Sequence, residues 1–302
     1  MRSIRVNRAE KTVWNPPFMS SKSLDTDAMF DRARRLCLSY WKELRRLRKV
    51  VLEQWGRDDI HDLRVASRRF RALLNLLRPL CDVKGSRRLA GKVRSLTALL
   101  GTLRNLDEAA VFLEANTTQF DMSAVIGRLH SMRADEQCAV SKVLKSFKPR
   151  EFNRIVRKIT AGMTVKNLAA RKKSSLPAYL ADVSIDRFGA IQTFMSAALC
   201  CEKDEQLHEL RIAIKKWRYF VEIASQILDR NANETVAQLK KYQSLLGKLN
   251  DLKVFKELCA ETGNSSEEQA AAEHLTALEH DRLLKEFTAL AVAEPLDYSF
   301  KI

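Results

Sequence analysis

The chain has 302 residues, of which 46% are hydrophobic, so it can bury a core as one large domain or two small ones. Its 53 Lys and Arg against 37 Asp and Glu give a formal net charge of +16, which indicates an anionic partner such as nucleic acid, a membrane surface or inorganic polyphosphate. The sequence has no apolar run long enough to span a bilayer and no secretory signal, so we predict a cytoplasmic protein without membrane insertion.

The first 80 residues predict an arm followed by two helices. Residues 1–22 are basic and contain a Pro-Pro pair and a serine cluster, which predict an irregular N-terminal arm. A long amphipathic helix is predicted over about 25–54. Gly56 is expected to end that helix, and Asp58 or Asp59 is expected to cap the next one.

The rest of the chain predicts further helices and no strands. The chain contains only 9 Gly and 6 Pro, and it shows no sustained alternation of polar and apolar residues, so the predicted class is all-α. The expected architecture is two internally duplicated antiparallel bundles in one compact domain over 23–293, with a C-terminal tail at 294–302. The first half is expected at about 23–165 and the second at about 177–293, joined by a polar linker at about 166–176. After the helix that Pro79 closes, helices are predicted at about 86–114, 123–147, 151–165, 177–201, 205–228, 234–262 and 267–293.

One 11-residue pattern occurs twice, 147 residues apart. It reads HDLRVASRRFR from His61 and HELRIAIKKWR from His208. At about 100° per residue, each copy places its cations on one helical stripe about 80° wide, with apolar residues on the opposite side. An amphipathic helix needs a polar face but not a purely cationic one, so two such faces predict a surface for a polyanion. The two stripes consist of His61, Arg64, Arg68 and Arg71, and of His208, Arg211, Lys215 and Arg218.

A second repeat supports the duplication. The segment LLGTLRNLD from Leu99 matches LLGKLNDLK from Leu245, 146 residues later. A glycine inside a helix costs about 1 kcal/mol relative to alanine. Because Gly101 and Gly247 occupy the same repeat position, we expect close helix–helix contact or a close approach to the backbone there.

These motifs resemble the CHAD family, the conserved histidine α-helical domain. The resemblance rests on H-x-L-R-[VI]-A-x-[RK]-[RK]-x-R at both repeats, on the extension RYFVE from Arg218, and on LGKLND from Leu246. It covers about residues 23–293. One departure is Asn105, where the family often has an aspartate. The E-x-E-x-K motif of a fused triphosphate-tunnel domain, found in some members, does not occur in the chain.

The resemblance implies two pseudo-symmetric helical bundles around a central basic groove or pore. It further implies non-enzymatic binding of inorganic polyphosphate, with association to polyphosphate granules. Carried over by position, the polyphosphate-binding residues are the eight members of the two stripes. The secondary candidates are Arg69 and Lys216 in the motif, and Arg87, Arg88, Lys92, Arg94, Arg104, Lys240, Lys241 and Lys248 near it. A base-free phosphate chain needs many cations along a concave track, and arginine suits it because its guanidinium donates bidentately to phosphate oxygens.

Catalytic and metal chemistry find little support in the sequence. The six cysteines lack C-x-x-C spacing, so we interpret them as buried or inert thiols. No phosphate-binding glycine loop, nucleophile elbow or H-E-x-x-H motif is present, so we expect no catalytic residues, no metal and no cofactor. The aromatic residues lie in apolar helical patterns, which favours core packing over base stacking.

Two other functions stay open at this point. Nucleic-acid binding is the first alternative, because the net charge alone fits either polyanion. A metal-dependent phosphoanhydride hydrolase is the second, and its carboxylates would be Asp107, Asp251 and Glu222. Structural pairing of these three with nearby arginines is the simpler interpretation. Neither the oligomeric state nor the preferred chain length follows from the sequence.

Overall fold

The computed structural model describes residues 25–81, 83–116, 121–170, 175–201, 204–262 and 266–300, and in these segments every regular element is a helix. This confirms the predicted all-α class. The predicted arm at 1–22 lies outside the described residues. In chain order the elements are α1 (Thr26–Gln54), α2 (Arg57–Leu77), a 3₁₀ turn (Arg78–Leu80), α3 (Ser86–Glu114), α4 (Ser123–Ser146), α5 (Pro149–Ala161), α6 (Val165–Ala170), α7 (Leu176–Cys201), α8 (Asp204–Leu228), α9 (Asn233–Thr262) and α10 (Ser266–Ala293).

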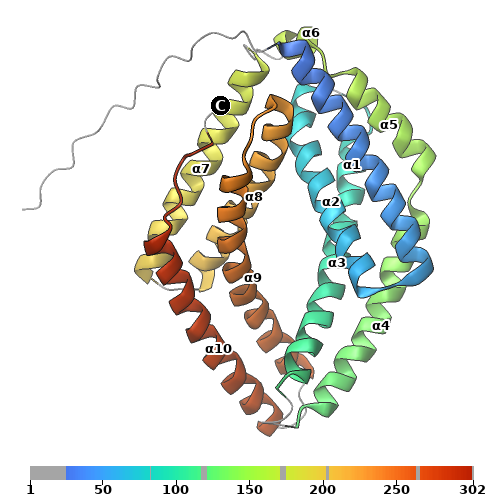
Figure 1. Ribbon diagram of the computed structural model, residues 1–302. Coiled ribbons are helices and arrows are strands. Elements are labelled where there is room, and N and C mark those ends of the chain that lie inside the picture. The colour runs from blue at the N-terminus through green and yellow to red at the C-terminus, as the bar shows by residue number, and fades with distance from the viewer. Residues whose placement is uncertain are drawn as a thin grey trace, which may run out of the picture.

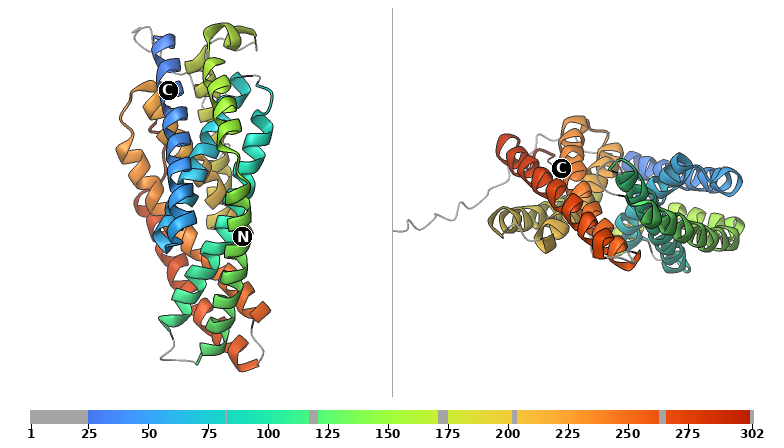
Figure 2. Two further views of the ribbon diagram at one scale, coloured as in Figure 1. Left: turned by 90° about the vertical axis from the view of Figure 1, so that its right-hand side faces the viewer. Right: turned by 90° about the horizontal axis from the view of Figure 1, so that it is seen from below.

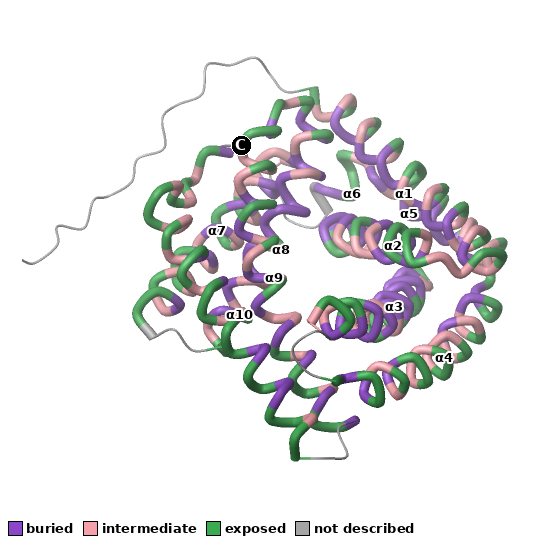
Figure 3. The backbone as a smooth tube through the Cα atoms, turned by 60° about the horizontal axis from the view of Figure 1, so that its bottom comes forward, coloured by how far each residue is buried: buried purple, intermediate pink, exposed green. Residues whose placement is uncertain are grey.

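Helices α1–α5 lie on one side of the molecule and α7–α10 on the other (Figures 1 and 2). Consecutive helices pack antiparallel from α1 to α4 and from α7 to α10, as short connections require, while α5 packs mainly on α1 and α3. The two sides meet mainly where α2 contacts α8, where α3 contacts α9 and where α1 contacts α8. The pairs α2–α3 and α8–α9 therefore face each other across the centre of the molecule (Figure 3).

The junction between α1 and α2 differs from the prediction. Trp55, not Gly56, ends α1: its backbone is left-handed, with φ 53°, and its N–H donates to the carbonyl of Val51. Gly56 instead precedes α2 in an extended conformation and supplies no side-chain cap. Asp58 and Asp59 lie inside the first turn of α2, where their charge favours the positive end of the helix dipole without capping it.

The predicted linker at about 166–176 is partly helical. The short helix α6 covers Val165–Ala170, and α7 already begins at Leu176. The preceding helix α5 starts earlier than predicted, at Pro149, because a proline fits the first turn, where no N–H is needed. Residues 171–174 of the linker lie outside the described segments.

In each half, the helix that carries a cationic stripe buries aromatic residues of its apolar face in the core. In the first half, Phe70 of α2 is fully buried, with its ring centroid 5.5 Å from that of Trp41. In the second half, Trp217 of α8 is 1% exposed and stacks on Phe220 at 5.3 Å. Burying each such side chain stabilises the fold by roughly 1.5–3 kcal/mol, so this burial fixes which face of α2 and α8 points inward.

The C-terminal segment after α10 has no helix in residues 294–300 but packs on the second half. Phe300 is 5% exposed, and the hydroxyls of Tyr298 and Ser184 lie 2.7 Å apart. Tyr298 also stacks near Trp217, with ring centroids 6.0 Å apart. This tail therefore closes the apolar core between α7 and α8.

The repeated glycines do not mark tight helix packing. A Cβ atom built on Gly101 or Gly247 would meet no atom within 4 Å outside its own helix. The expectation of close helix–helix contact is therefore wrong at both positions. Gly247 instead lines the cavity described below, where the missing side chain leaves backbone open to the cavity.

In the described residues, no helix has the length and apolar character that crossing a membrane requires.

Candidate polyanion-binding site

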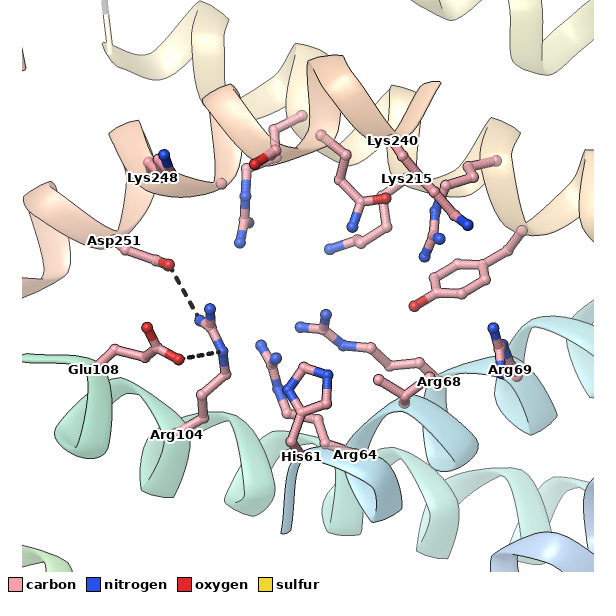
Figure 4. Close-up of a pocket in the computed structure, with 17 residues that line it drawn as sticks. His61, Arg64, Arg68, Arg69, Arg104, Glu108, Lys215, Lys240, Lys248 and Asp251 are labelled. Atoms are coloured by element: carbon pink, nitrogen blue, oxygen red, sulfur yellow. Dashed lines mark hydrogen bonds and ion pairs between the residues drawn. The ribbon is translucent and has the colours of Figure 1, made fainter. Parts of the chain in front are cut away.

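The two cationic stripes face each other at the centre of the molecule. Phe70 and Trp217 bury the apolar faces of α2 and α8 in their own halves, so the opposite faces turn toward the other half. Arg68 of α2 and Lys215 of α8 both project into the space between the halves (Figure 4). Amphipathicity within each helix thus places the cations of two distant segments together.

The facing stripes enclose a central cavity of about 560 Å³. Helices α2, α3, α8 and α9 all contribute cations to its lining, which contains nine Lys or Arg side chains, one histidine and two carboxylates. The positive side chains of the lining point toward one another (Figure 4). The lining comprises His61, Arg64, Val65, Arg68, Arg69, Arg104, Glu108, Arg211, Lys215, Arg218, Tyr219, Lys240, Gln243, Ser244, Gly247, Lys248 and Asp251.

Two of the nine cations are held by carboxylates. Arg104 of α3 donates to Asp251 of α9 at 3.2 Å, which ties the two halves together, and it lies 3.5 Å from Glu108. Arg218 pairs with Glu222 at 3.0 Å. The other seven lining cations make no ion pair with any described residue; they are Arg64, Arg68, Arg69, Arg211, Lys215, Lys240 and Lys248.

Burial makes the unpaired charges of Arg64, Arg68, Arg211 and Lys215 costly, whereas Arg69, Lys240 and Lys248 are exposed. Arg64 is only 6% exposed, and its buried Nε has no hydrogen-bond partner among the described residues. Burial and then repulsion from Arg68 and Arg104 lower the pKa of Arg64 to about 9, which leaves it charged at neutral pH. An anion in the cavity would supply the missing acceptor and offset the repulsion.

Burial and neighbouring charges act more strongly still on Lys215. Burial first, and then the positive charges of Arg68 and Arg211, lower the pKa of its ammonium group to about 7. Burial is also the main cause that lowers the pKa of Arg68 and of Arg211. The central cavity therefore concentrates positive charge that the protein itself does not neutralise.

Tyr219 lines the cavity next to Arg218. Its ring lies under the guanidinium of Arg218, 4.6 Å from the ring centroid. Tyr219 itself is 6% exposed. The ring therefore supports one cation of α8 at the wall of the cavity.

Most of the predicted stripe residues lie together, but two do not line the central cavity. His61, Arg64, Arg68, Arg211, Lys215 and Arg218 line it. Arg71 lines an adjoining cavity between α2, α3, α7 and α8. His208 is exposed and lies outside both cavities, with its Nδ1 2.8 Å from the side-chain oxygen of Asn250. The equivalent repeat positions of His61 and His208 therefore have different surroundings.

The secondary candidates divide into three groups by position. Arg69, Arg104, Lys240 and Lys248 line the central cavity. Arg87, Arg94 and Lys216 line the adjoining cavity. Arg88, Lys92 and Lys241 line neither, and Arg88 and Lys241 instead form ion pairs with Glu151 and Glu294.

Several lining residues were missed by the sequence reasoning. Tyr219 follows Arg218 directly in the RYFVE segment, so its position beside a stripe cation was a usable signal. Gln243 and Ser244 lie on α9 near the predicted Lys240, with no pattern that marks them. Arg187 of α7 lines the adjoining cavity and had no sequence signal, because α7 carries no repeat of the cationic motif.

The three carboxylates considered for catalysis are each engaged by arginine. Asp107 accepts from Arg133 at 2.5 Å. Asp251 and Glu222 accept from Arg104 and Arg218, as described above. Each carboxylate therefore forms the predicted pairing with an arginine.

The cysteines fall into two classes. Cys37, Cys81 and Cys259 are buried, and burial raises the pKa of the Cys37 thiol to about 12 and that of Cys259 to about 11, which keeps both protonated. Cys138 and Cys200 are exposed, so these two of the expected buried or inert thiols are not buried. The sixth, at position 201, has no described side chain.

The fold defines a helical protein whose two halves enclose a cationic cavity, and comparison with known proteins assigns its family. The model of the CHAD domain matches residues 35–260, so the chain belongs to the CHAD family. A comparison with the curated proteins gives no match.

Two solved structures share the fold. The CHAD domain from the plant Ricinus communis superposes with a TM-score of 0.59 at 20% identity, covering 89% of each chain. PptA from Streptomyces chartreusis superposes with a TM-score of 0.60 at 16% identity, covering 87% of this chain and 96% of that one. At these identities the likeness extends to the architecture and not to the site residues.

Proposed function

We propose that the protein binds inorganic polyphosphate in the central cavity without transforming it. One observation carries the proposal: nine Lys and Arg from both halves line one cavity of about 560 Å³, against two carboxylates. The buried, unpartnered Nε of Arg64 adds a donor that lacks an acceptor. A chain of phosphates supplies closely spaced negative oxygens that such a lining can contact from several sides.

The composition of the cavity favours a base-free anion over nucleic acid. Among the described lining residues Tyr219 is the single aromatic side chain, and its ring already carries Arg218. Proteins that bind single-stranded nucleic acid generally offer exposed aromatic rings on which bases stack. The large aromatic residues Trp217 and Phe70 are buried in the core instead. A ligand that needs only charge and hydrogen bonds therefore suits the cavity better.

A binding role without catalysis is supported by the state of the carboxylates. A phosphoanhydride hydrolase would need carboxylates to hold divalent cations. Asp251, Glu222 and Asp107 are instead engaged by arginines. The proposal therefore assigns them to the support of the cationic lining. We further propose association with polyphosphate granules, which colocalisation of a fluorescent fusion with stained polyphosphate would test.

The test is calorimetric titration with long-chain polyphosphate at two salt concentrations. The variant Arg68→Gln/Arg211→Gln removes two unpaired lining cations, one from each half. The variant Lys49→Gln/Lys158→Gln removes the same charge from exposed positions in α1 and α5 and serves as the control. We expect the first variant to bind at least about tenfold more weakly and with a salt slope lower by about one to two units, while the control stays near the wild type.

Three results would contradict the proposal. Equal affinities of the cavity variant and the control, with both folds verified by circular dichroism, would move the site elsewhere. Tighter binding of single-stranded RNA or DNA than of polyphosphate in direct competition would favour the nucleic-acid alternative. Release of orthophosphate from polyphosphate in the presence of Mg²⁺ would favour the alternative of a metal-dependent phosphoanhydride hydrolase.

A further inference from the structure

The outer side of the first half carries positive charge that the cavities do not use. Residues 137–181 contain eleven Lys or Arg and one carboxylate, Glu151, which pairs with Arg88 of α3. None of the eleven lines the central or the adjoining cavity. Eight of them lie in the described segments, where all are exposed and none forms an ion pair; these outer cations are Lys142, Lys145, Lys148, Arg150, Arg154, Arg157, Lys158 and Lys166.

Helix α5 arranges four of the outer cations as one stripe. At about 100° per residue, Arg150, Arg154, Arg157 and Lys158 fall within about 100° of the helix circumference. The opposite side of the helix, which includes Phe152, is buried where α5 packs on α1 and α3. The packing of α5 therefore turns all four cations away from the core and toward solvent.

Helix α1 adds two cations beside this stripe. The guanidinium of Arg45 donates to the side-chain oxygen of Asn153 in α5 at 3.2 Å, and that of Arg48 donates to the carbonyl oxygen of Leu144 in α4 at 2.7 Å. Neither arginine forms an ion pair with a described residue. Arg45, Arg48 and the outer cations thus form one connected outer surface over α1, α4, α5 and α6 (Figure 2, left).

This outer surface is separate from the central cavity. Helices α2 and α3 lie between the cavity and the helices α1, α4 and α5 (Figure 3). No described residue of α1, α4 or α5 lines the central or the adjoining cavity. A ligand on the outer surface therefore does not compete for space with a ligand in either cavity.

The composition of the outer surface suits a phosphate backbone better than a bilayer. Helices that bind a bilayer surface bury Trp, Phe or Leu at the boundary of the acyl chains. Among the described residues from 142 to 166, Val165 is the single exposed large apolar side chain. Duplex DNA carries one negative charge per about 1.7 Å, so about eleven phosphates lie along the roughly 20 Å length of α5.

A second copy of the chain fits the outer surface less well. Helix α10 is the part of the described chain richest in carboxylates. Of these, Glu268 pairs with Arg128, and Glu279 and Glu286 pair with Arg282. Much of the negative charge of α10 is therefore already compensated within the chain.

We propose that the outer surface binds the phosphate backbone of double-stranded DNA without reading its sequence, independently of any ligand in the central cavity. Phosphate contacts by Lys and Arg fix a protein on the duplex but carry no sequence information. Arg suits this contact because its guanidinium donates bidentately to phosphate oxygens. With the outer surface and the cavity on different sides of α2 and α3, one molecule can hold a duplex and a second polyanion at once.

The experiment compares two variants that lose the same charge from different sides of the molecule. The outer variant, Arg154→Gln/Arg157→Gln, removes two cations of the α5 stripe. The control, Lys253→Gln/Lys285→Gln, removes two exposed cations of α9 and α10 that line neither the central nor the adjoining cavity. Binding of a labelled random-sequence DNA duplex of about 30 base pairs is measured by fluorescence anisotropy at two salt concentrations.

We expect the outer variant to bind the duplex about tenfold more weakly than the control, with a salt slope lower by about one to two units. The cavity variant Arg68→Gln/Arg211→Gln should keep its DNA affinity within about threefold of the wild type, because its charges lie on the other side of α2 and α3.

Three results would overturn the inference once circular dichroism has verified each fold. The first is equal DNA binding by the outer variant and the control. The second is a loss of DNA binding in the cavity variant as large as in the outer variant, which would place the duplex at the cavity. The third is tighter binding to vesicles of phosphatidylserine and phosphatidylcholine than to DNA, lost in the outer variant, which would assign the outer surface to a bilayer.

Discussion

We predict that Lys215 makes the proposed polyphosphate binding dependent on pH, in a direction that follows from its surroundings. Its ammonium pKa is lowered to about 7 by burial and by the charges of Arg68, Arg211, Arg71 and Arg64. Below about pH 7 the free protein already carries this charge, and above it the amine is neutral. A bound phosphate chain favours the charged form and raises the pKa again, so binding above about pH 7 must take up a proton.

The size of the effect follows from linkage. If the ligand restored the ordinary pKa of lysine, affinity would fall by at most about tenfold per pH unit between about pH 7 and 10. Lys215 is partly accessible to solvent, so screening reduces the expected slope to about three- to fivefold per unit. Long chains are the ligand of choice, because the few terminal phosphates that titrate near neutral pH then contribute little.

The assay is calorimetry at about pH 8 in two buffers of different ionisation enthalpy, which reports the number of protons taken up. We expect uptake of about half a proton to one proton by the wild type and almost none by Lys215→Arg, which stays charged throughout. Lys215→Met is expected to bind weakly with a flat pH profile. A wild-type affinity that does not fall between about pH 7.5 and 9, or an identical slope in Lys215→Arg, would refute the reasoning.

The stability of the unliganded fold should respond with the opposite sign. The folded pKa of Lys215 lies below its unfolded value of 10.5, so between about pH 7 and 10.5 the unfolded chain binds more protons. The contribution of this residue to the free energy of unfolding therefore rises with pH across that window. The melting temperature of the wild type should accordingly rise relative to that of Lys215→Met from about pH 7 to pH 9. A relative fall would contradict the assignment.

Four further substitutions test the lining and the repeated glycines. Replacing Arg64 with Met should raise the free energy of unfolding by about 1 kcal/mol while weakening polyphosphate binding, because it removes a buried, unpartnered charge; loss of stability in chemical denaturation would contradict this. Asp251→Asn should lower stability by about 1 kcal/mol through loss of its bond to Arg104, yet tighten polyphosphate binding severalfold, so weaker binding in calorimetry would contradict the electrostatic account. Gly101→Ala and Gly247→Ala should each stabilise the fold by about 0.5–1 kcal/mol in thermal unfolding, since a Cβ meets nothing at either site; destabilisation would show that the helices need the glycines.

The sequence by itself determined the helices and the inward-facing cations. The spacing of apolar residues around Phe70 and Trp217 requires amphipathic helices, because burying that stripe dominates the local energy. Once the apolar stripe is buried, the cations of the same helix must lie on the other side. The predicted cavity residues Arg64, Arg68 and Lys215 follow from this periodicity, which is local information.

The tertiary structure alone decided which cations share a cavity. His61 and His208 hold the same repeat position, yet only His61 lines the central cavity, whereas the ring of His208 meets Asn250 of α9. Arg187 lines the adjoining cavity from a helix without the motif, and Lys92 does not line it although it lies between Arg87 and Arg94 in the chain. Such choices depend on how helices distant in sequence are placed against one another. Periodicity within a helix fixes the face on which a side chain lies, but only the packing of that helix against its neighbours fixes what the face meets.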